Sequence, residues 1–427
     1  MGGTRAETGA APSPAALSYW RRIFGTFLAG EGASLVGTSV YAVALPALAV
    51  LFLHANPGQV AELYFASQIP YFVLALPAGA IVDRHSKRYV LIATDITAAC
   101  LVAVIPAASA VGILSIPLLQ AVALLLGAVT VLHQAAATAI LPQLVPPPEL
   151  HQAASRLGAV LGAADTAGVY LGGAVIPAVG AARAIALDSL SYLFSAWCAS
   201  RIPAEPAPAP RTRTRLTKEM WEGVRYVMRD PLLRPLALCL GGTGAGAGMI
   251  TALSSWYLLA VLHIGSTGLA MIMGVSGAGG LAGALLAPRA VRHLGPGRVL
   301  TGTVALYWVL GLPLLVAGPG RLWLSVLALA GGLQLAAAAC ASSTVLAVRQ
   351  QICPPLLRAR AQQTATWLVA GSRPLAALGA AALAATAGVR VTLLAGTLVL
   401  AGTAAALWSS PVRHLADMPT PSSRSPS

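Results

Sequence analysis

The stretch Pro77–Leu91 reads Pro-Ala-Gly-Ala-Ile-Val-Asp-Arg-His-Ser-Lys-Arg-Tyr-Val-Leu. An apolar run from Tyr64 to Val82 leads into a cluster of one Asp and three Lys or Arg residues, and apolar residues resume at Tyr89. A long apolar run is typical of a helix that crosses a membrane. The pattern therefore predicts one membrane helix, a very short charged turn and a second helix that runs back.

The composition extends this prediction to the whole chain. Of its 427 residues, 57% are hydrophobic and only 9% are charged, whereas a soluble domain is about 25% charged. A sliding window of about 19 residues finds twelve apolar spans, each near the length that crosses a bilayer as a helix. We therefore expect an all-α integral membrane protein with twelve transmembrane helices. The predicted spans are 23–50, 60–82, 89–110, 116–141, 153–179, 183–201, 235–260, 267–287, 298–317, 322–346, 361–385 and 389–410.

The net charge of +14 follows from membrane topology. If the N-terminus lies inside the cell, most Lys and Arg residues fall in inner loops, and the outer loops hold little beyond Arg183, Arg321 and Arg390. The positive-inside rule explains this bias and places both termini in the cytoplasm. The basic excess therefore does not indicate a nucleic-acid partner.

A proline-rich and basic segment at 203–234 divides the spans into two groups of six. It predicts a cytoplasmic linker, and residues 218–231 of it predict a short basic amphipathic helix on the inner membrane surface, with a calmodulin-type target as the alternative. We expect a disordered cytoplasmic tail at 1–22, helical bundles at 23–202 and 235–410, and a second cytoplasmic tail at 411–427. A weaker copy of the opening motif, from Gly283 to Arg298, indicates internal duplication.

These motifs resemble those of the major facilitator superfamily of transporters. The segment 77–91 is similar to the superfamily's loop between its second and third helices, and Trp221–Arg234 and Leu187–Leu193 resemble its drug-exporter and enterobactin-exporter-like branch. The resemblance implies two six-helix bundles that rock about a central cavity and open it to each side in turn. It also implies proton-coupled efflux of amphipathic small molecules from a bacterial-type inner membrane, by a monomer that is not an enzyme.

Other functions remain open within and outside this class. The alternatives are a siderophore or metabolite exporter, an importer of the same fold, and a scaffold or signalling relative that transports nothing. Nucleotide binding is disfavoured, because the glycines of 241–248 follow no strand and precede no Lys-Ser or Lys-Thr pair. The five cysteines are scattered singly, so the sequence predicts neither a metal site nor a cofactor.

The resemblance also assigns a role to the charged turn. It implies that Asp83 approaches the start of the eleventh helix, near 361–363, where a carboxylate would satisfy open backbone N–H groups. We expect the loop to act as a conformational latch; the alternative is that its basic residues only anchor the topology, and Lys87 and Arg88 could do both. The residues concerned are Gly79, Asp83, Arg84, Lys87 and Arg88.

Three charged residues lie deep within predicted spans. Glu31 is nine residues beyond Arg22, which places it roughly 14 Å into its helix. Asp165 lies at a similar depth in the fifth span, and Arg373 lies deeper in the eleventh. A charge at the centre of a membrane helix costs about 2.5–3.5 kcal/mol on insertion scales, so each needs a reason. Either acid could exchange a proton and Arg373 could hold an acid or an anionic substrate; alternatively, they form a static ion pair.

Two other acids have structural interpretations. Asp95 is seven residues beyond Arg88 and is expected to join the charged turn, while Asp188 is expected to meet Arg183 near the outer surface. Several polar or aromatic residues at membrane depth are candidates for lining a cavity, although core packing would explain each one alone. They are Tyr41, His133, Gln134, Tyr170, Trp256 and Gln334.

Overall fold

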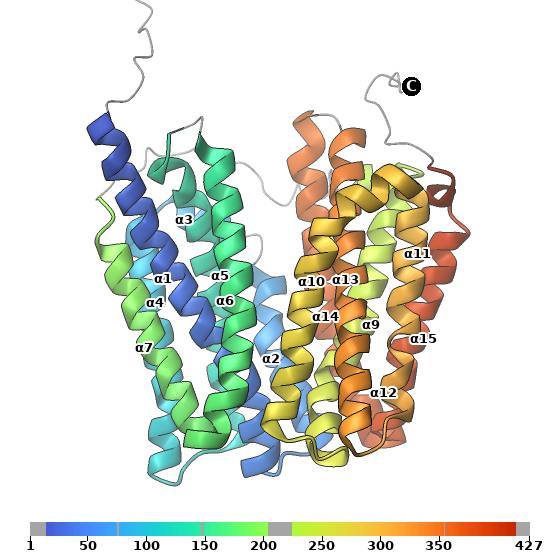
Figure 1. Ribbon diagram of the computed structural model, residues 1–427, viewed down its shortest axis with the longest axis horizontal. Helices are drawn as coiled ribbons and strands as arrows, with labels where there is room; N and C mark the ends of the chain where they lie inside the picture. The colour runs from blue at the N-terminus through green and yellow to red at the C-terminus, as the bar shows by residue number, and fades with distance from the viewer. Residues whose placement is uncertain (1–13, 75–76, 147–148, 204–223, 354, 416–427) are drawn as a thin grey trace, which may run out of the picture.

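The computed structural model describes residues 14–74, 77–146, 149–203, 224–353 and 355–415, and these residues form helices without any strand. Figure 1 shows two helical halves side by side, α1 to α7 in one and α9 to α15 in the other. Helices dominate because a backbone in lipid must satisfy its hydrogen bonds within its own segment. The two halves correspond to the two predicted groups of spans.

The N-terminal half begins with a long helix whose last turn widens into a π-helix. The helices of this half are α1 (Pro14–Ala47) with η1 (Leu48–Phe52), α2 (Pro57–Leu74), α3 (Pro77–Asp83), α4 (Lys87–Ala110), α5 (Ile116–Leu144), α6 (Leu150–Val179) and α7 (Ala181–Ser200). The predicted second span is broken, because α2 and α3 meet at an angle of 64°. Within the half, α1 packs between α6 and α7, and α4 packs between α5 and α7.

The C-terminal half repeats this plan. Its helices are α9 (Leu233–Trp256) with η3 (Tyr257–Val261), α10 (Gly265–Leu294), α11 (Pro296–Val309), α12 (Leu312–Val316), α13 (Arg321–Ile352), α14 (Pro355–Ala387) and α15 (Val389–Trp408), and a 3₁₀ turn, η4 (Pro411–His414), follows them. The two π-helical ends match in sequence as well. Each is followed by a Leu-His pair whose histidine is left-handed, with φ of 51° at His54 and 53° at His263.

Length and composition identify most of these helices as membrane spans. Among the described residues, ten helices are long and apolar enough to cross a membrane, or eleven if the bent pair α2 and α3 is one span. The predicted span at 183–201 is the exception. It corresponds to α7, whose Arg183, Asp188 and serines reduce its apolar content. The fold is therefore all-helical and multi-pass, as the sequence predicts, with fewer clear spans than expected.

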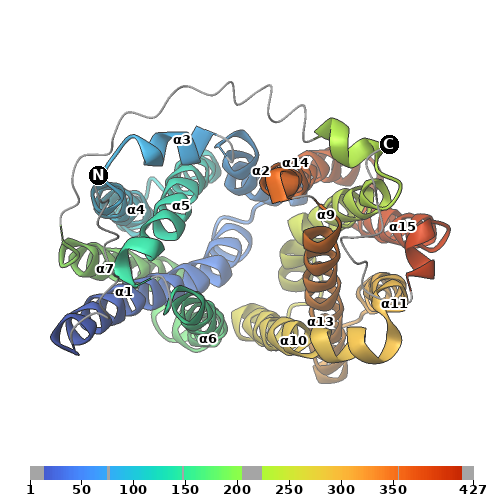
Figure 2. The same ribbon diagram turned by 90° about the horizontal axis from the view of Figure 1, so that it is seen from above.

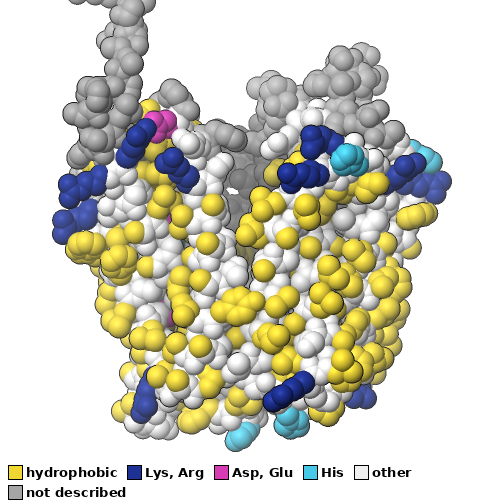
Figure 3. Space-filling view, in the orientation of Figure 1, with side chains coloured by type: hydrophobic (Ala, Val, Ile, Leu, Met, Phe, Trp, Pro, Cys, Tyr) yellow, Lys and Arg dark blue, Asp and Glu magenta, His cyan; other side chains and the backbone are white. Residues whose placement is uncertain are grey.

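The halves meet along two pairs of helices, α2 against α14 and α6 against α10, as seen from above in Figure 2. Glycine allows the second pair to approach closely, because a Cβ on Gly173 would collide with Ala270. The start of α1 and the end of α15 lie at the same end of the molecule (Figure 1). Figure 3 shows most basic side chains of the visible face at that end, and apolar side chains across the middle.

The end opposite the termini is closed by contacts between the halves. The indole N–H of Trp256, at the end of α9, donates to the carbonyl of Ala55 across the interface, at 3.0 Å. The π-helical segments η1 and η3 also pack against each other there. At the other end, Figure 3 shows a cleft between the halves. The molecule is therefore open toward its termini and closed on the far side.

Most of the linker lies outside the described residues, including Trp221. Its described part is helical over 224–229. Val227 is buried against Leu233, Ala237 and Cys353, so this part packs on the C-terminal half.

Candidate functional site

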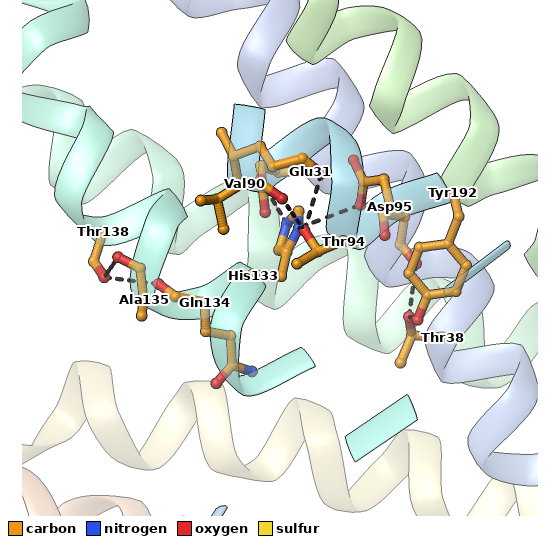
Figure 4. Close-up of polar contacts among 12 residues, drawn as sticks. Glu31, Thr38, Val90, Thr94, Asp95, His133, Gln134, Ala135, Thr138 and Tyr192 are labelled. Carbon is orange, nitrogen blue, oxygen red and sulfur yellow. Dashed lines mark hydrogen bonds and ion pairs between the residues drawn. The ribbon is translucent and has the colours of Figure 1, made fainter. Parts of the chain in front are cut away.

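Three charged side chains from three helices meet inside the N-terminal half (Figure 4). His133 of α5 lies between two carboxylates, with Nε2 3.1 Å from Glu31 of α1 and Nδ1 3.2 Å from Asp95 of α4. The Asp95 side chain is 1% exposed, whereas those of Glu31 and His133 are 12% and 14% exposed. We call these three residues the acid–imidazole cluster. Glu31 and His133 are therefore the members of the cluster with some exposed surface.

Hydrogen bonds around the imidazole indicate its charge. Thr94 donates its hydroxyl proton to backbone carbonyls of its own helix, at 2.7 Å from Val90 and 2.9 Å from Leu91. Its oxygen, 3.1 Å from His133 Nδ1, is therefore free to accept from the ring. The carboxylate of Glu31 accepts from Nε2 on the other side. Both ring nitrogens thus face acceptors, and this pattern fits an imidazolium held between two acids.

The cluster corrects one expectation and joins two candidates. Asp95 contacts His133 and not the charged turn, so its predicted place near Arg88 is wrong. Glu31 and His133 were separate candidates in the sequence, and the structure brings them together. Asp95 is the member of the cluster that the sequence did not place there. Charge balance is the signal that could identify it, because two acids and one histidine occur at similar depth in an otherwise apolar bundle.

A cavity of about 410 Å³ lies between the two halves. Its wall is mostly aliphatic and comes largely from the C-terminal half, with hydroxyl and amide groups interspersed. Asp165 of α6 is the only charged residue among the described residues that line it. The polar lining residues are Asp165, Thr251, Ser254, Ser255, Ser276, Tyr307 and Gln334.

Two predicted candidates lie in this cavity wall. Asp165 is exposed and accepts a short hydrogen bond of 2.6 Å from Ser39 of α1, which fixes the carboxylate toward the cavity. The side-chain N–H of Gln334 in α13 donates to the carbonyl of Tyr307 at 2.9 Å. This hydrogen bond fixes the orientation of the whole Gln334 amide, including its oxygen. An apolar chamber with one oriented acid suits an amphipathic ligand.

The other cavity candidates lie elsewhere. His133, Tyr41, Tyr170 and Trp256 are not among the lining residues, and Trp256 instead closes the far end. Arg373 of α14 is exposed and is not among the residues that line the cavity. None of the ion pairs among the described residues joins Arg373 to Glu31 or Asp165, so the predicted static pair is not seen.

The charged turn lies at the end of the molecule that is open. Asp83, Arg84 and Gly79 are exposed there, and Arg88 donates to the carbonyl of Ser200 at 2.7 Å. That bond fastens the turn to the end of α7 within the N-terminal half. The predicted contact of Asp83 with 361–363 falls on side chains outside the described residues.

Two helical halves around a cavity, with a buried acid–imidazole cluster in one of them, define a membrane transporter of the major facilitator type. The family model for transmembrane secretion effectors within that superfamily matches residues 14–426. The chain therefore belongs to this family. Its long apolar helices are those of a multi-pass membrane protein.

Relatives with curated descriptions agree at this level. The chain is 26% identical over 234 residues to the MFS-type transporter y4rN of Sinorhizobium fredii, covering 54% of this chain and 58% of that one. It is 26% identical over 258 residues to the MFS-type transporter YfiS of Bacillus subtilis, covering 59% of this chain and 57% of that one. The match thus spans little more than half the length of these relatives.

Solved structures share the fold. A mutant of the nucleoside transporter NupG superposes with a TM-score of 0.76 at 11% identity, over 91% of this chain and 99% of that one. A bacterial homologue of the iron transporter ferroportin, in an inward-facing state, superposes with a TM-score of 0.70 at 16% identity, over 91% and 98%. A peptide transporter of the POT family gives 0.68 at 10% identity, over 95% and 99%. Their differing substrates leave the substrate of this chain open.

Proposed function

We propose that this protein exports amphipathic small molecules in exchange for protons, by alternating access. Twelve helices would cross the membrane, with α7 as one of them despite its polar residues and with α2 and α3 as one bent span. Both termini would lie in the cytoplasm of a bacterial cell, and the protein would act as a monomer in the inner membrane. The distribution of Lys and Arg supports this orientation, because it is densest at the end that holds the termini.

The main support for proton-coupled transport is that two sites with acidic residues lie apart from each other. The acid–imidazole cluster lies inside the N-terminal half, and none of its members lines the cavity that holds Asp165. Histidine and carboxylates exchange protons readily under physiological conditions. A transporter that couples substrate movement to proton movement needs a binding site for each. Asp165 would bind the substrate, and the acid–imidazole cluster would bind the proton.

The cavity favours amphipathic substrates that carry a positive charge. Aliphatic side chains supply most of the wall, and Asp165 offers the only charge among the described lining residues. A desolvated amine beside a fixed carboxylate forms a charge-assisted hydrogen bond, which is stronger than a neutral one. Anionic substrates, such as deprotonated siderophores, would be repelled by the same group.

The charged turn would control opening at the cytoplasmic end. Asp83, Arg84, Lys87 and Arg88 lie at the open end of the molecule (Figure 1), and Gly79 leaves space beside its Cα. Closing that end requires the halves to approach, so an acid and bases at the rim can form different contacts in the two states. Asp83→Asn should reduce transport without affecting substrate binding.

Inside-out membrane vesicles would test the function. A pH-sensitive dye reports a proton gradient established inside them, and amphipathic amines are added outside at the exposed cytoplasmic face. We expect an amine to collapse the gradient with the wild type, and Glu31→Gln and His133→Gln to abolish the collapse while amine binding persists. Gradient collapse that is unchanged in both variants would refute the proton site.

A further inference from the structure

A second buried acid lies between α1 and α7, apart from the acid–imidazole cluster. Asp188 of α7 is fully buried, and Ser191, one turn later, donates to its Oδ1 at 3.1 Å. Tyr41 of α1 and Tyr192 of α7 are also buried, one helical turn from Gly37 and from Asp188 respectively. Thr38 of α1 is hydrogen-bonded to the Tyr192 hydroxyl at 3.0 Å, as Figure 4 shows. We call these five residues the α1–α7 oxygen cluster.

Helical spacing and one glycine bring these oxygens together. Thr38 and Tyr41 are three residues apart on α1, and Asp188, Ser191 and Tyr192 are three and four apart on α7, so each set shares a helix face. Gly37 lies on the facing side of α1. A Cβ at that position would collide with the Ser191 hydroxyl and with Asp188 Oδ1. The carboxylate therefore lies directly against the α1 backbone.

The charge of Asp188 has no protein partner among the described residues. None of the ion pairs between them includes Asp188, whereas Asp95 has His133. Within the described part of the chain, neither its Oδ2 nor the hydroxyl of Tyr41 has a hydrogen-bond partner. Buried carboxylates in proteins are paired, bind a metal ion or are neutral, and unpartnered buried polar atoms call for an explanation. Two such oxygens in one cluster point to a shared positive ligand.

We propose that the α1–α7 oxygen cluster binds one sodium ion, held by the Asp188 carboxylate and by the hydroxyls around it. Every side-chain donor atom in the cluster is an oxygen, and hard cations prefer oxygen ligands. The carboxylate carries one charge, so a monovalent ion neutralises it, while a divalent ion would leave a buried positive charge. Oxygens that share a cation ligate it instead of forming hydrogen bonds to each other. This explains why the Tyr41 hydroxyl and Asp188 Oδ2 have no hydrogen-bond partner among the described residues.

Sodium would then stabilise the packing of α1 against α7. The ion would hold two helices of one half together, independently of the cavity and of the acid–imidazole cluster. The test therefore needs neither a substrate nor a proton gradient. If the protein proves not to export amines, the sodium site is still supported by sodium binding. If it binds no sodium, the proposed export function is not affected.

Radioactive sodium binding and thermal unfolding of the purified full-length protein test the site. Choline chloride is exchanged for sodium chloride at constant ionic strength. We expect saturable binding at one site per chain and a melting temperature that rises with sodium, because a ligand that binds only the folded state stabilises it. Asp188→Asn should abolish both effects. Tyr41→Phe, which keeps the carboxylate, should weaken sodium binding about tenfold, the factor expected for loss of one ligand worth about 1.4 kcal/mol.

Two comparisons keep the test decisive. Glu62→Gln removes an exposed acid of α2 that is hydrogen-bonded to Gln120, and it should leave sodium binding unchanged. In sodium-free buffer Asp188→Asn should melt at or above the temperature of the wild type, because it removes a buried charge. Wild-type protein that binds no sodium, or an Asp188→Asn variant that binds it equally well, would overturn the proposal.

Discussion

At the scale of single residues, His133 is the one basic side chain that contacts both Glu31 and Asp95 among the described residues. Its loss would leave two carboxylates buried near each other in the membrane. Breaking a buried ion pair by removing one partner costs about 3–5 kcal/mol, because the remaining charge is uncompensated. The cluster therefore contributes to stability as well as to the proposed proton exchange.

His133→Ala should accordingly lower the free energy of unfolding by about 3–5 kcal/mol. Thermal unfolding of the purified protein in detergent measures the change. The double variant His133→Ala/Asp95→Asn is the matched control, since it removes the more buried of the two acids and should recover much of the loss. Equal stability of wild type and His133→Ala would show that the three charges do not interact.

Asp165→Asn should weaken the binding of amine-bearing substrates by about 10- to 150-fold, since a hydrogen bond to a charged group contributes about 1.5–3 kcal/mol. A neutral analogue of the same shape should bind the variant and the wild type equally. Ser39→Ala, which removes only the group that orients the carboxylate, should cause a smaller loss. Equilibrium binding to purified protein gives these affinities, and an equal loss for the neutral analogue would contradict a charge effect.

Residue depth was predictable from the sequence, whereas residue partners were not. Counting along the helix placed Glu31 and Asp165 inside the membrane, and both occupy polar sites. Sequence distance suggests Arg88 as the partner of Asp95 and Arg183 as that of Asp188, but Asp95 contacts His133, and none of the ion pairs among the described residues includes Asp188. Partners in a bundle come from the facing helix, and the facing direction depends on packing that a single sequence does not show.

At the scale of helices, α7 shows why composition alone undercounts the spans. The residues that lower its apolar content include Asp188, Ser191 and Ser195, and all three lie toward neighbouring helices, with Asp188 and Ser195 buried. A membrane helix can carry such groups on the face that packs against neighbouring helices, away from lipid. The π-helical ends were missed for another reason. Their signal is the repeated Leu-His pair at 53–54 and 262–263, which only a comparison of the two halves detects.

Gly37→Ala tests how closely α1 and α7 must pack. The added methyl group would meet the Ser191 hydroxyl and the Asp188 carboxylate, so we expect a loss of about 1–3 kcal/mol in stability, as in other overpacked interiors. The matched control is Gly25→Ala in the same helix, where nothing lies within 4 Å of an added Cβ. Thermal unfolding compares the two, and an equally stable Gly37→Ala protein would mean that the interface yields without cost.

At the scale of the whole molecule, the two halves are joined unequally at their two ends. The far end is closed by the Trp256–Ala55 hydrogen bond and by the contact of η1 with η3. The end with the termini has a cleft. Alternating access also requires a state that is open at the far end and closed at the end with the termini. The contacts at the far end therefore set the population of that state.

Trp256→Phe should shift this balance, because it keeps an aromatic ring but removes the N–H that bonds to Ala55. A hydrogen bond contributes about 1 kcal/mol, and loss of that amount changes a two-state ratio about fivefold. Spin labels at Asn56→Cys and Arg321→Cys, in a Cys100→Ala background, would report the distance across the far end by electron spin resonance. We expect the long-distance population to grow about fivefold.

Trp408→Phe, at an exposed position on α15, is the control and should change nothing. If Trp256→Phe also leaves the distances unchanged, the Trp256 bond does not hold the far end closed, and the packing of η1 against η3 must suffice.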